Sequence, residues 1–240
     1  MHYVGTSPDT DISEDYYGAF CDRLQQLLGA DRQDPPFVAL LSNGTSGDIN
    51  NINSRQKAPP RKPYEQIQHV ADAVAAEVHR VCQTIQYREW VPLSVAQKEI
   101  QLGVRLPSDA DVAHAEQILA KAKGRELHGL EEVYAREIVL LKDFPKEAPL
   151  LIQTLRIGDL GIAAIPCEVF AETGLAIKAQ SLFKPTFTIE LANGYNGYLP
   201  TPEQHKLGGY ETWRARSSYL EAEAAPKIFD TVMALFGQLK

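Results

Sequence analysis

The sequence has little cysteine, no long apolar run and no cluster of positive charge. Its three cysteines, Cys21, Cys82 and Cys167, are odd in number and widely spaced, which argues against a disulfide framework and against a CxxC zinc motif. No run of about 18 apolar residues occurs, so we expect no transmembrane segment. The formal net charge is −7 and the Lys and Arg residues are scattered, so we expect no nucleic-acid partner.

What is present is the composition of a folded globular chain. Hydrophobic residues make up 44% of the 240 residues and charged residues 23%, enough for one large domain or two small ones. We find no internal repeat and no low-complexity tract. The start of the chain, residues 1–4, has the pattern of a strand end, so we expect further sequence upstream. No signal peptide is visible in this chain, and its localisation stays open.

Apolar spacing predicts helices that alternate with strands. The clearest helix spans 63–86, where Ile67, Val70 and Val74 begin a series at intervals of three to four residues. The other expected helices are 13–29, 108–123, 127–141, 169–181 and 217–239, and the expected strands are 37–42, 91–102, 149–157, 160–165 and 186–191. The predicted fold is α/β (mixed α+β), with layered sheets and flanking helices.

Turn and cap residues set the expected boundaries. Ser13 and Gly29 suit the two ends of the first helix, and Gly124 should end the helix 108–123. Gly158-Asp159 predicts a hairpin turn. Pro226 should break or kink the last helix.

Residues 43–63 are polar and rich in Gly, Asn and Pro. The segment is long for a loop without secondary structure, and such loops are often functional.

Glu168 is the first candidate for a metal ligand. It follows an apolar strand and a Pro166-Cys167 turn and precedes a helix, so its carboxylate should leave the end of the strand. The local pattern alone favours the alternative interpretation, a first-turn glutamate that complements the helix dipole. Cys167 is either a packing residue or a reactive thiol, and no histidine adjacent in sequence supports the second.

Residues 165–170 and 191–203, followed by Tyr210-Glu211, resemble the metal-binding half of the neutral/alkaline (non-lysosomal) ceramidases. That family has a Pro-Gly-Glu turn where this chain has Pro166-Cys167-Glu168. Its Asn-x-Tyr-x-x-Tyr segment is matched from Asn193 through Tyr195 to Tyr198. The resemblance covers nearly the whole chain in outline, with its specific motifs at 43–51 and 165–211.

The resemblance implies a zinc amidohydrolase site. It assigns Zn²⁺ ligation to His2, Glu168 and Tyr198, with a further histidine upstream that this chain does not contain. It assigns Tyr210 a hydrogen bond to the reacting carbonyl, and Tyr195 a place near the substrate. It also implies that residues 1–240 are one ceramidase-like catalytic domain fragment, without the upstream part and the C-terminal Ig-like domain. Relatives are often secreted or periplasmic.

One departure from the family concerns the nucleophile. Where the family has Asn-Ala-Gly-Asp-Val-Ser-Pro-Asn, this chain has Asn50 in place of the serine, and an amide cannot attack as an alkoxide. Metal-bound water could attack instead, with Asn50 orienting substrate or donating to an oxyanion. Ser46 is another candidate to approach the site. Asp48 is a candidate catalytic-site residue whose expected contacts are backbone hydrogen bonds that hold the loop.

Two functions therefore remain open at this stage. The first is a zinc-dependent hydrolase of an amide or ester bond, with a small-molecule or lipid-like substrate that need not be ceramide, and a place in lipid or sphingolipid metabolism. The second is a truncated or degenerate relative that binds a ligand or partner without turnover. A generic α/β binding domain is a third and weaker interpretation. The oligomeric state is not predicted.

Overall fold

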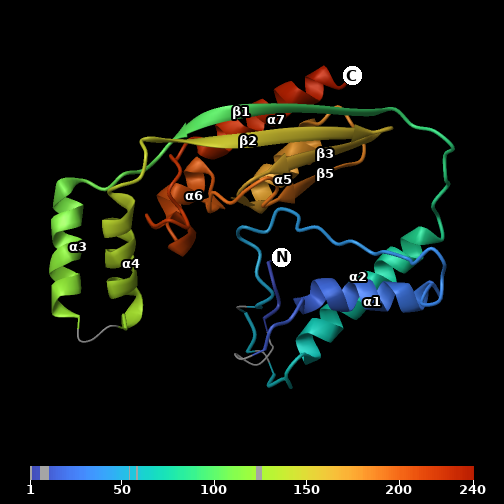
Figure 1. The fold of residues 1–240 in the computed structure, drawn as a ribbon, viewed down its shortest axis with the longest axis horizontal. Helices are drawn as coiled ribbons and strands as arrows, with labels where there is room; N and C mark the ends of the chain where they lie inside the picture. The colour runs from blue at the N-terminus through green and yellow to red at the C-terminus, as the bar shows by residue number, and fades with distance from the viewer. Residues whose placement is uncertain (1, 6–10, 54, 58, 123–125) are drawn as a thin grey trace. The chain divides into compact units, whose positions relative to one another are not determined.

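The chain divides into two compact units in the computed structural model, which describes residues 2–5, 11–53, 55–57, 59–122 and 126–240. The helical unit comprises Met1–Asn43 and Asn50–Val91, and the sheet unit comprises Gly44–Ile49 and Pro92–Lys240. The fold is mixed α/β with helices flanking sheets, as the sequence predicted (Figure 1).

The helical unit is built on α1 (Asp15–Leu27) and α2 (Glu65–Cys82). Phe20 of α1 packs in one core with Ala71 and Ala75 of α2, whose short, fully buried side chains suit a close helix contact. Gly29 ends α1 as predicted: at φ 63° its N–H donates to the Gln26 carbonyl, and the next N–H donates to the carbonyl of Gln25.

The predicted buried strand at 37–42 is wrong. These residues are not assigned to a strand. Phe37, Ala39 and Leu41 pack partly against the helical core, whereas Val38 and Leu40 are 72% and 86% exposed. The prediction came from the apolar run of these residues, but only alternate residues of the run pack on helices and the others face solvent. Residues 2–5, where the sequence has the pattern of a strand end, are not assigned to a strand either.

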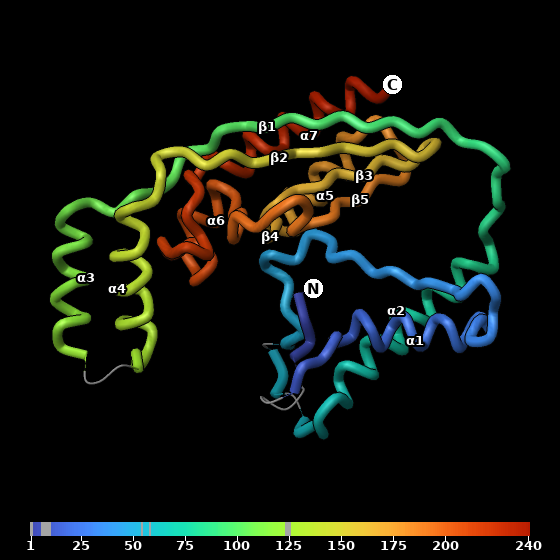
Figure 2. Tube along the Cα trace, viewed as in Figure 1, coloured from blue at the N-terminus to red at the C-terminus, as the bar shows by residue number. Residues whose placement is uncertain are grey.

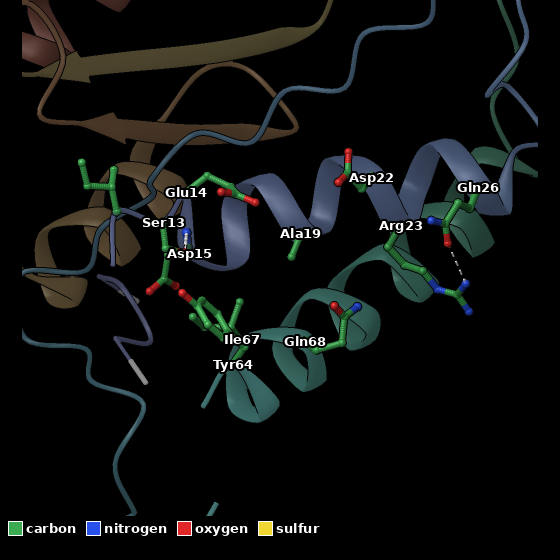
Figure 3. A pocket seen from close by; sticks show the side chains of 11 residues that line it. Ser13, Glu14, Asp15, Ala19, Asp22, Arg23, Gln26, Tyr64, Ile67 and Gln68 are labelled. Atoms are coloured by element: carbon green, nitrogen blue, oxygen red, sulfur yellow. Dashed lines mark hydrogen bonds between the residues drawn. The ribbon is translucent and has the colours of Figure 1, made fainter. Parts of the chain in front are cut away.

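A surface cavity of about 410 Å³ lies along α1 and α2 (Figure 3). Its lining is largely polar and includes Glu14, Asp22 and Gln68, and Arg23 donates to Gln26 beside it at 3.3 Å. The cavity therefore has the character of a solvated groove between two helices.

The sheet unit is organised around a four-stranded sheet of order β1-β2-β3-β5. Its strands are β1 (Leu93–Gly103), β2 (Glu147–Ile157), β3 (Leu160–Ile165) and β5 (Thr186–Glu190). The first three pair antiparallel, with the predicted turn at Gly158 between β2 and β3, and β5 pairs parallel to β3. Helices α3 (Asp109–Lys121) and α4 (Gly129–Leu141) form a hairpin between β1 and β2 (Figure 1).

Ser108 caps α3 with a reciprocal capping box to Asp111. The predicted stop at Gly124 lies outside the described residues.

Helix α7 (Ala224–Gln238) covers one face of this sheet. Ile228, Val232 and Phe236 share a core with Leu150 and Ile165 of the strands, and all five are fully buried. The predicted kink at Pro226 is wrong, because α7 begins at Ala224 and the proline sits in its first turn. An N–H there has no intrahelical acceptor, so its loss costs the helix no hydrogen bond.

Two short strands form a second, parallel pair, β4 (Glu168–Val169) with β6 (Tyr198–Leu199). β4 lies between β3 and α5 (Ala171–Gln180), as Figure 2 traces. The helix predicted from residue 169 therefore starts two residues later. After β6 come the short helix α6 (Pro202–Leu207) and the 3₁₀ turn η1 (Tyr210–Thr212). None of the described helices has the length and apolar character needed to cross a membrane.

Phe236→Ala should destabilise the sheet unit by about 3–5 kcal/mol, because the ring is fully buried and packs edge-on against Phe183 at 5.6 Å. Leu175→Ala on α5, at a side chain that is 64% exposed, should change the free energy of unfolding by less than about 0.5 kcal/mol. Denaturant titration measures both. Equal effects would contradict the assignment of this core.

Candidate functional site

The pairing of β4 with β6 places Glu168 directly opposite Tyr198. The Glu168 N–H donates to the Gly197 carbonyl at 2.9 Å, and the Tyr198 N–H donates to the Ser217 carbonyl at 2.8 Å. Gly197 has φ 73°, and a Cβ there would lie 2.3 Å from the Ser217 oxygen. Only glycine allows this approach of three backbone segments. Two of the three predicted zinc ligands are therefore neighbours.

Tyr195 contacts the carboxylate of Glu168. Its hydroxyl donates to Glu168 Oε1 at 3.0 Å, and the glutamate side chain is 8% exposed. Burial first, and then the charge and hydrogen bond of Glu168, raise the pKa of Tyr195 to about 12. The phenol is therefore neutral near pH 7 and serves as a hydrogen-bond donor.

Tyr210 stands against Tyr198, with ring centroids 5.7 Å apart and planes at 87°. Burial raises the pKa of Tyr198, and a side-chain hydrogen bond with Tyr210 and the charge of Glu168 raise it further. The structure thus gathers Glu168, Tyr195, Tyr198 and Tyr210: one buried carboxylate with phenols around it. All four were predicted as site residues, and their proximity is observed, whereas their roles stay predictions.

Cys167, just before Glu168, is fully buried. Burial raises the pKa of its thiol, and the neighbouring charges of Glu168 and Glu190 raise it further. The thiol is therefore protonated and inaccessible, which favours the packing interpretation over a reactive nucleophile.

The loop Gly44–Ile49 is held on β4 by Glu190, a carboxylate 3% exposed at the end of β5. Its Oε2 accepts from the N–H of Ser46 at 3.0 Å and from the N–H of Val169 at 2.8 Å, and its Oε1 accepts from the Ser46 hydroxyl. Sequence reasoning missed Glu190. Its position at a strand end, just before the tyrosine segment, was the available signal.

Ser46 and Asp48 both hold this loop in place through hydrogen bonds. Ser46 is fully buried on Glu190, so its predicted approach to substrate stays a prediction that would require this hydrogen bond to open. Asp48 Oδ1 accepts from the N–H of Ala171 at 2.8 Å, at the first residue of α5, and this is the backbone contact that was expected of it. Gly47 fits tightly here, because a Cβ would lie 2.4 Å from the Glu168 carbonyl oxygen.

Arg105 fixes the segment that carries Tyr210. Its guanidinium donates to the carbonyls of Leu220 at 2.8 Å, Thr212 at 2.9 Å and Ser218 at 2.6 Å. Burial, and then the charge of Arg214, lower its pKa from the usual arginine value. His205 on α6 lies nearby, and burial followed by the charge of Arg105 lowers its pKa, which favours a neutral imidazole.

Two ion pairs connect the same segment to the helical hairpin. Arg216 pairs with Glu137 of α4 through two bonds of 2.8 and 2.9 Å, and Arg214 pairs with Asp111 of α3 at 2.9 Å. The Arg216 hydrogen bond is the largest cause that lowers the pKa of Glu137. The hairpin and the Tyr210 segment are therefore joined by charge-assisted hydrogen bonds.

His2 and Asn50 belong to the helical unit, and their membership in the site stays a prediction. The carboxylate of Asp15 accepts from the N–H groups of Val4 at 2.9 Å and Gly5 at 2.7 Å. Asn51 donates to the Val4 carbonyl at 3.1 Å. The backbone that follows His2 is thus held in place, while Asn50 itself is exposed.

Within the described ranges, no three His, Cys, Asp or Glu side chains converge on a common point.

Comparison with solved structures shows the fold. The chain is similar to "neutral ceramidase from Pseudomonas aeruginosa" with a TM-score of 0.67 at 16% identity, over 98% of this chain and 42% of that one. It is also similar to a "ceramidase complexed with C2" with a TM-score of 0.66 at 13% identity, over 98% and 44% of the two chains. The chain thus spans less than half the length of these structures. No family model and no curated protein sequence matches it.

Glu190→Ala should lower the free energy of unfolding by more than about 3 kcal/mol, because it strands buried N–H donors of Ser46 and Val169. Ser46→Ala removes only the hydroxyl that donates to the buried Glu190 carboxylate and should cost about 1.5–3 kcal/mol. Glu203→Ala, at an exposed position on α6, is the surface control. Denaturant titration ranks the three, and a Glu190 variant as stable as the Glu203 variant would contradict the anchoring role.

Proposed function

We propose that this chain is part of a zinc-dependent hydrolase of amide or ester bonds. The observation that carries the proposal is the register pairing of Glu168 with Tyr198, with the Tyr210 ring against Tyr198. These residues are the ones that the ceramidase resemblance assigns to the metal and to the reacting carbonyl. The ceramidase fold of the whole chain supports the same assignment.

The donor set fits zinc. Glu168 offers a buried carboxylate, Tyr198 a phenol oxygen beside it, and His2 would supply an imidazole nitrogen, all of which are donor types that Zn²⁺ accepts. The raised pKa of Tyr198 means that its phenol is neutral without a cation, so that ligation would release a proton. Apparent zinc affinity should therefore increase with pH.

Zinc, when bound, supplies Lewis acidity and lowers the pKa of a coordinated water. The chain supplies the rest. Tyr210 would donate its hydroxyl proton in a hydrogen bond to the substrate carbonyl oxygen, where negative charge develops. Tyr195 holds one oxygen of Glu168 and so orients its carboxylate. Asn50 would orient the substrate or donate to the oxyanion. Asp48 ties the loop that precedes Asn50 to the start of α5.

The substrate class follows from the same relatives. We propose a small-molecule or lipid-like amide or ester, of which the N-acyl amide of ceramide is one candidate, in lipid or sphingolipid metabolism. We also propose that both compact units belong to one ceramidase-like catalytic domain.

Asn50 favours a second candidate function. Because a carboxamide cannot act as a nucleophile, a relative with this residue in place of serine could bind the same ligands without hydrolysing them. The alternative is then a non-catalytic domain that binds its ligand with the same residues.

The zinc assignment predicts that Glu168→Gln removes bound zinc while Glu203→Gln retains it. The amide keeps the shape of the carboxylate but loses its charge, and Glu203 is exposed on α6. Metal analysis after dialysis, together with zinc titration at pH 6, 7 and 8, measures this. Equal zinc in both variants would contradict ligation by Glu168.

The carbonyl assignment predicts that Tyr210→Phe lowers kcat on fluorogenic amides and esters about 100-fold, the typical loss of one oxyanion donor. Zinc content and thermal stability should not change. Tyr87→Phe, at a side chain 92% exposed, is the control. Full activity in Tyr210→Phe would refute this role, and zinc binding with no hydrolysis of any substrate would favour the binding function.

A further inference from the structure

The turn that carries Glu168 is wrapped by the segment 191–197. Three successive carbonyls before Glu168 accept N–H groups of this segment: Ile165 from Ala192 at 3.2 Å, Pro166 from Asn196 at 2.9 Å, and Cys167 from Leu191 at 3.1 Å. Within the segment, Leu191 and Asn193 have φ values of 55° and 67°, which are unfavourable for residues with a side chain and persist where surrounding contacts fix them. The segment therefore depends on an anchor that holds its shape.

Asn196 provides such an anchor. Its backbone N–H and its side-chain Nδ2 both donate to the Pro166 carbonyl, at 2.9 and 3.0 Å, and its Oδ1 accepts from the Tyr219 hydroxyl at 2.6 Å. The hydroxyl fixes the orientation of the amide, because a flipped amide would place Oδ1 against the Pro166 oxygen, and both are acceptors. One side chain thus joins the turn before Glu168, the tyrosine segment and the stretch after η1.

Tyr219 presents its hydroxyl from a fixed position. Its side chain is buried, its ring packs edge-on against Phe144 at 5.6 Å, and its carbonyl accepts from the Arg105 N–H at 2.7 Å. Burial first, and then the neighbouring Cys167, raise the pKa of Tyr219 to about 12. The phenol is therefore protonated near neutral pH and can donate to Asn196.

The contacts of Glu168 depend on where Asn196 lies. Tyr195, whose hydroxyl donates to Glu168 Oε1 at 3.0 Å, precedes Asn196 directly, and Gly197, whose carbonyl accepts from the Glu168 N–H at 2.9 Å, follows it directly. Tyr198, the register partner of Glu168, is the next residue. A shift of Asn196 would accordingly displace all three neighbours of Glu168 together.

We propose that Asn196, oriented by the Tyr219 hydroxyl, is the positioning residue that holds the Glu168 carboxylate opposite Tyr198 for ligation of the cation. Asn196 acts through the Pro166 carbonyl and the tyrosine segment, and Tyr219 acts through Asn196. The effects on zinc and on hydrolysis rest on the proposed function, whereas the effect on the backbone around Glu168 does not.

The first test uses metal-free protein and needs no substrate. Tyr219→Phe removes one hydroxyl and keeps the ring that packs on Phe144. Hydrogen exchange of the Glu168 and Tyr198 amides, followed by NMR, should become about tenfold faster, the equivalent of one lost hydrogen bond. The Gly161 amide, which donates to the Pro185 carbonyl at the other end of β3, should exchange as before. Unchanged exchange at Glu168 and Tyr198 would overturn the proposal.

Thr186→Val is the matched control. The Thr186 hydroxyl is buried at the start of β5, at the opposite end of that strand from Glu190, and it donates to the Phe183 carbonyl at 2.7 Å. Its removal also costs a buried hydrogen bond of the sheet unit, so thermal melting should show a loss of Tm similar to that of Tyr219→Phe. Zinc affinity and exchange at Glu168 should not change. Equal zinc weakening in the two variants would reduce the role of Tyr219 to general stability.

The second test measures zinc affinity in a double-mutant cycle. Tyr219→Phe and Asn196→Ala should each weaken zinc binding about 10–100-fold, the usual effect of losing a residue that orients a metal ligand. The double variant should bind zinc no more weakly than Asn196→Ala alone, because Tyr219 acts through Asn196. With saturating zinc, Tyr219→Phe should lower kcat on fluorogenic esters and leave KM unchanged. Losses of zinc affinity that add independently would contradict the arrangement.

The two tests separate this proposal from the proposed function. An unaltered chain that neither binds zinc nor hydrolyses any substrate would overturn the proposed function, and hydrogen exchange would still decide whether Tyr219 and Asn196 hold the backbone around Glu168. Zinc binding and hydrolysis that neither Tyr219→Phe nor Asn196→Ala alters would overturn the positioning role and leave the proposed function.

Discussion

The site depends on one short main-chain pairing, the parallel contact of β4 with β6. Through it Glu168 and Tyr198, far apart in sequence, become register partners. Gly197 allows the Ser217 backbone to close on the same point, so the segment that leads back to Tyr210 is brought in as well. Because these contacts are between backbone groups, the fold brings the carboxylate and the phenols together, and the Tyr195 hydrogen bond then orients the carboxylate.

Two polar side chains secure the backbone around that pairing. Glu190 accepts backbone donors from the loop Gly44–Ile49 and from β4, and Arg105 donates to carbonyls of the segment after η1. Glu190 is buried, so its loss would leave the N–H donors that it accepts from without partners, whereas Arg105 is only partly buried. Their effect is to hold irregular backbone rigidly beside a regular sheet, which is what a preorganised site requires. Neither stood out as a site residue in the sequence.

The predictions succeeded where local pattern and tertiary environment agree. The helix over α2 and the hairpin at Gly158 follow from apolar period and turn chemistry, and the structure confirms both. The strand expected at 37–42 was wrong, because a short apolar run also occurs where an irregular segment packs on helices. The kink expected at Pro226 failed, because where a helix begins depends on the packing of the segment before it.

The sequence by itself determined the elements, the fold class and the residue types available for chemistry: a carboxylate after a strand, then tyrosines on a glycine-rich segment. Only the tertiary structure decided that these groups meet and that the Ser46 hydroxyl is hydrogen-bonded to Glu190. The reason is physical. The spacing of apolar residues shows which face of each helix or strand is buried. Whether site residues from different segments meet depends on hydrogen bonds and packing between segments distant in the chain.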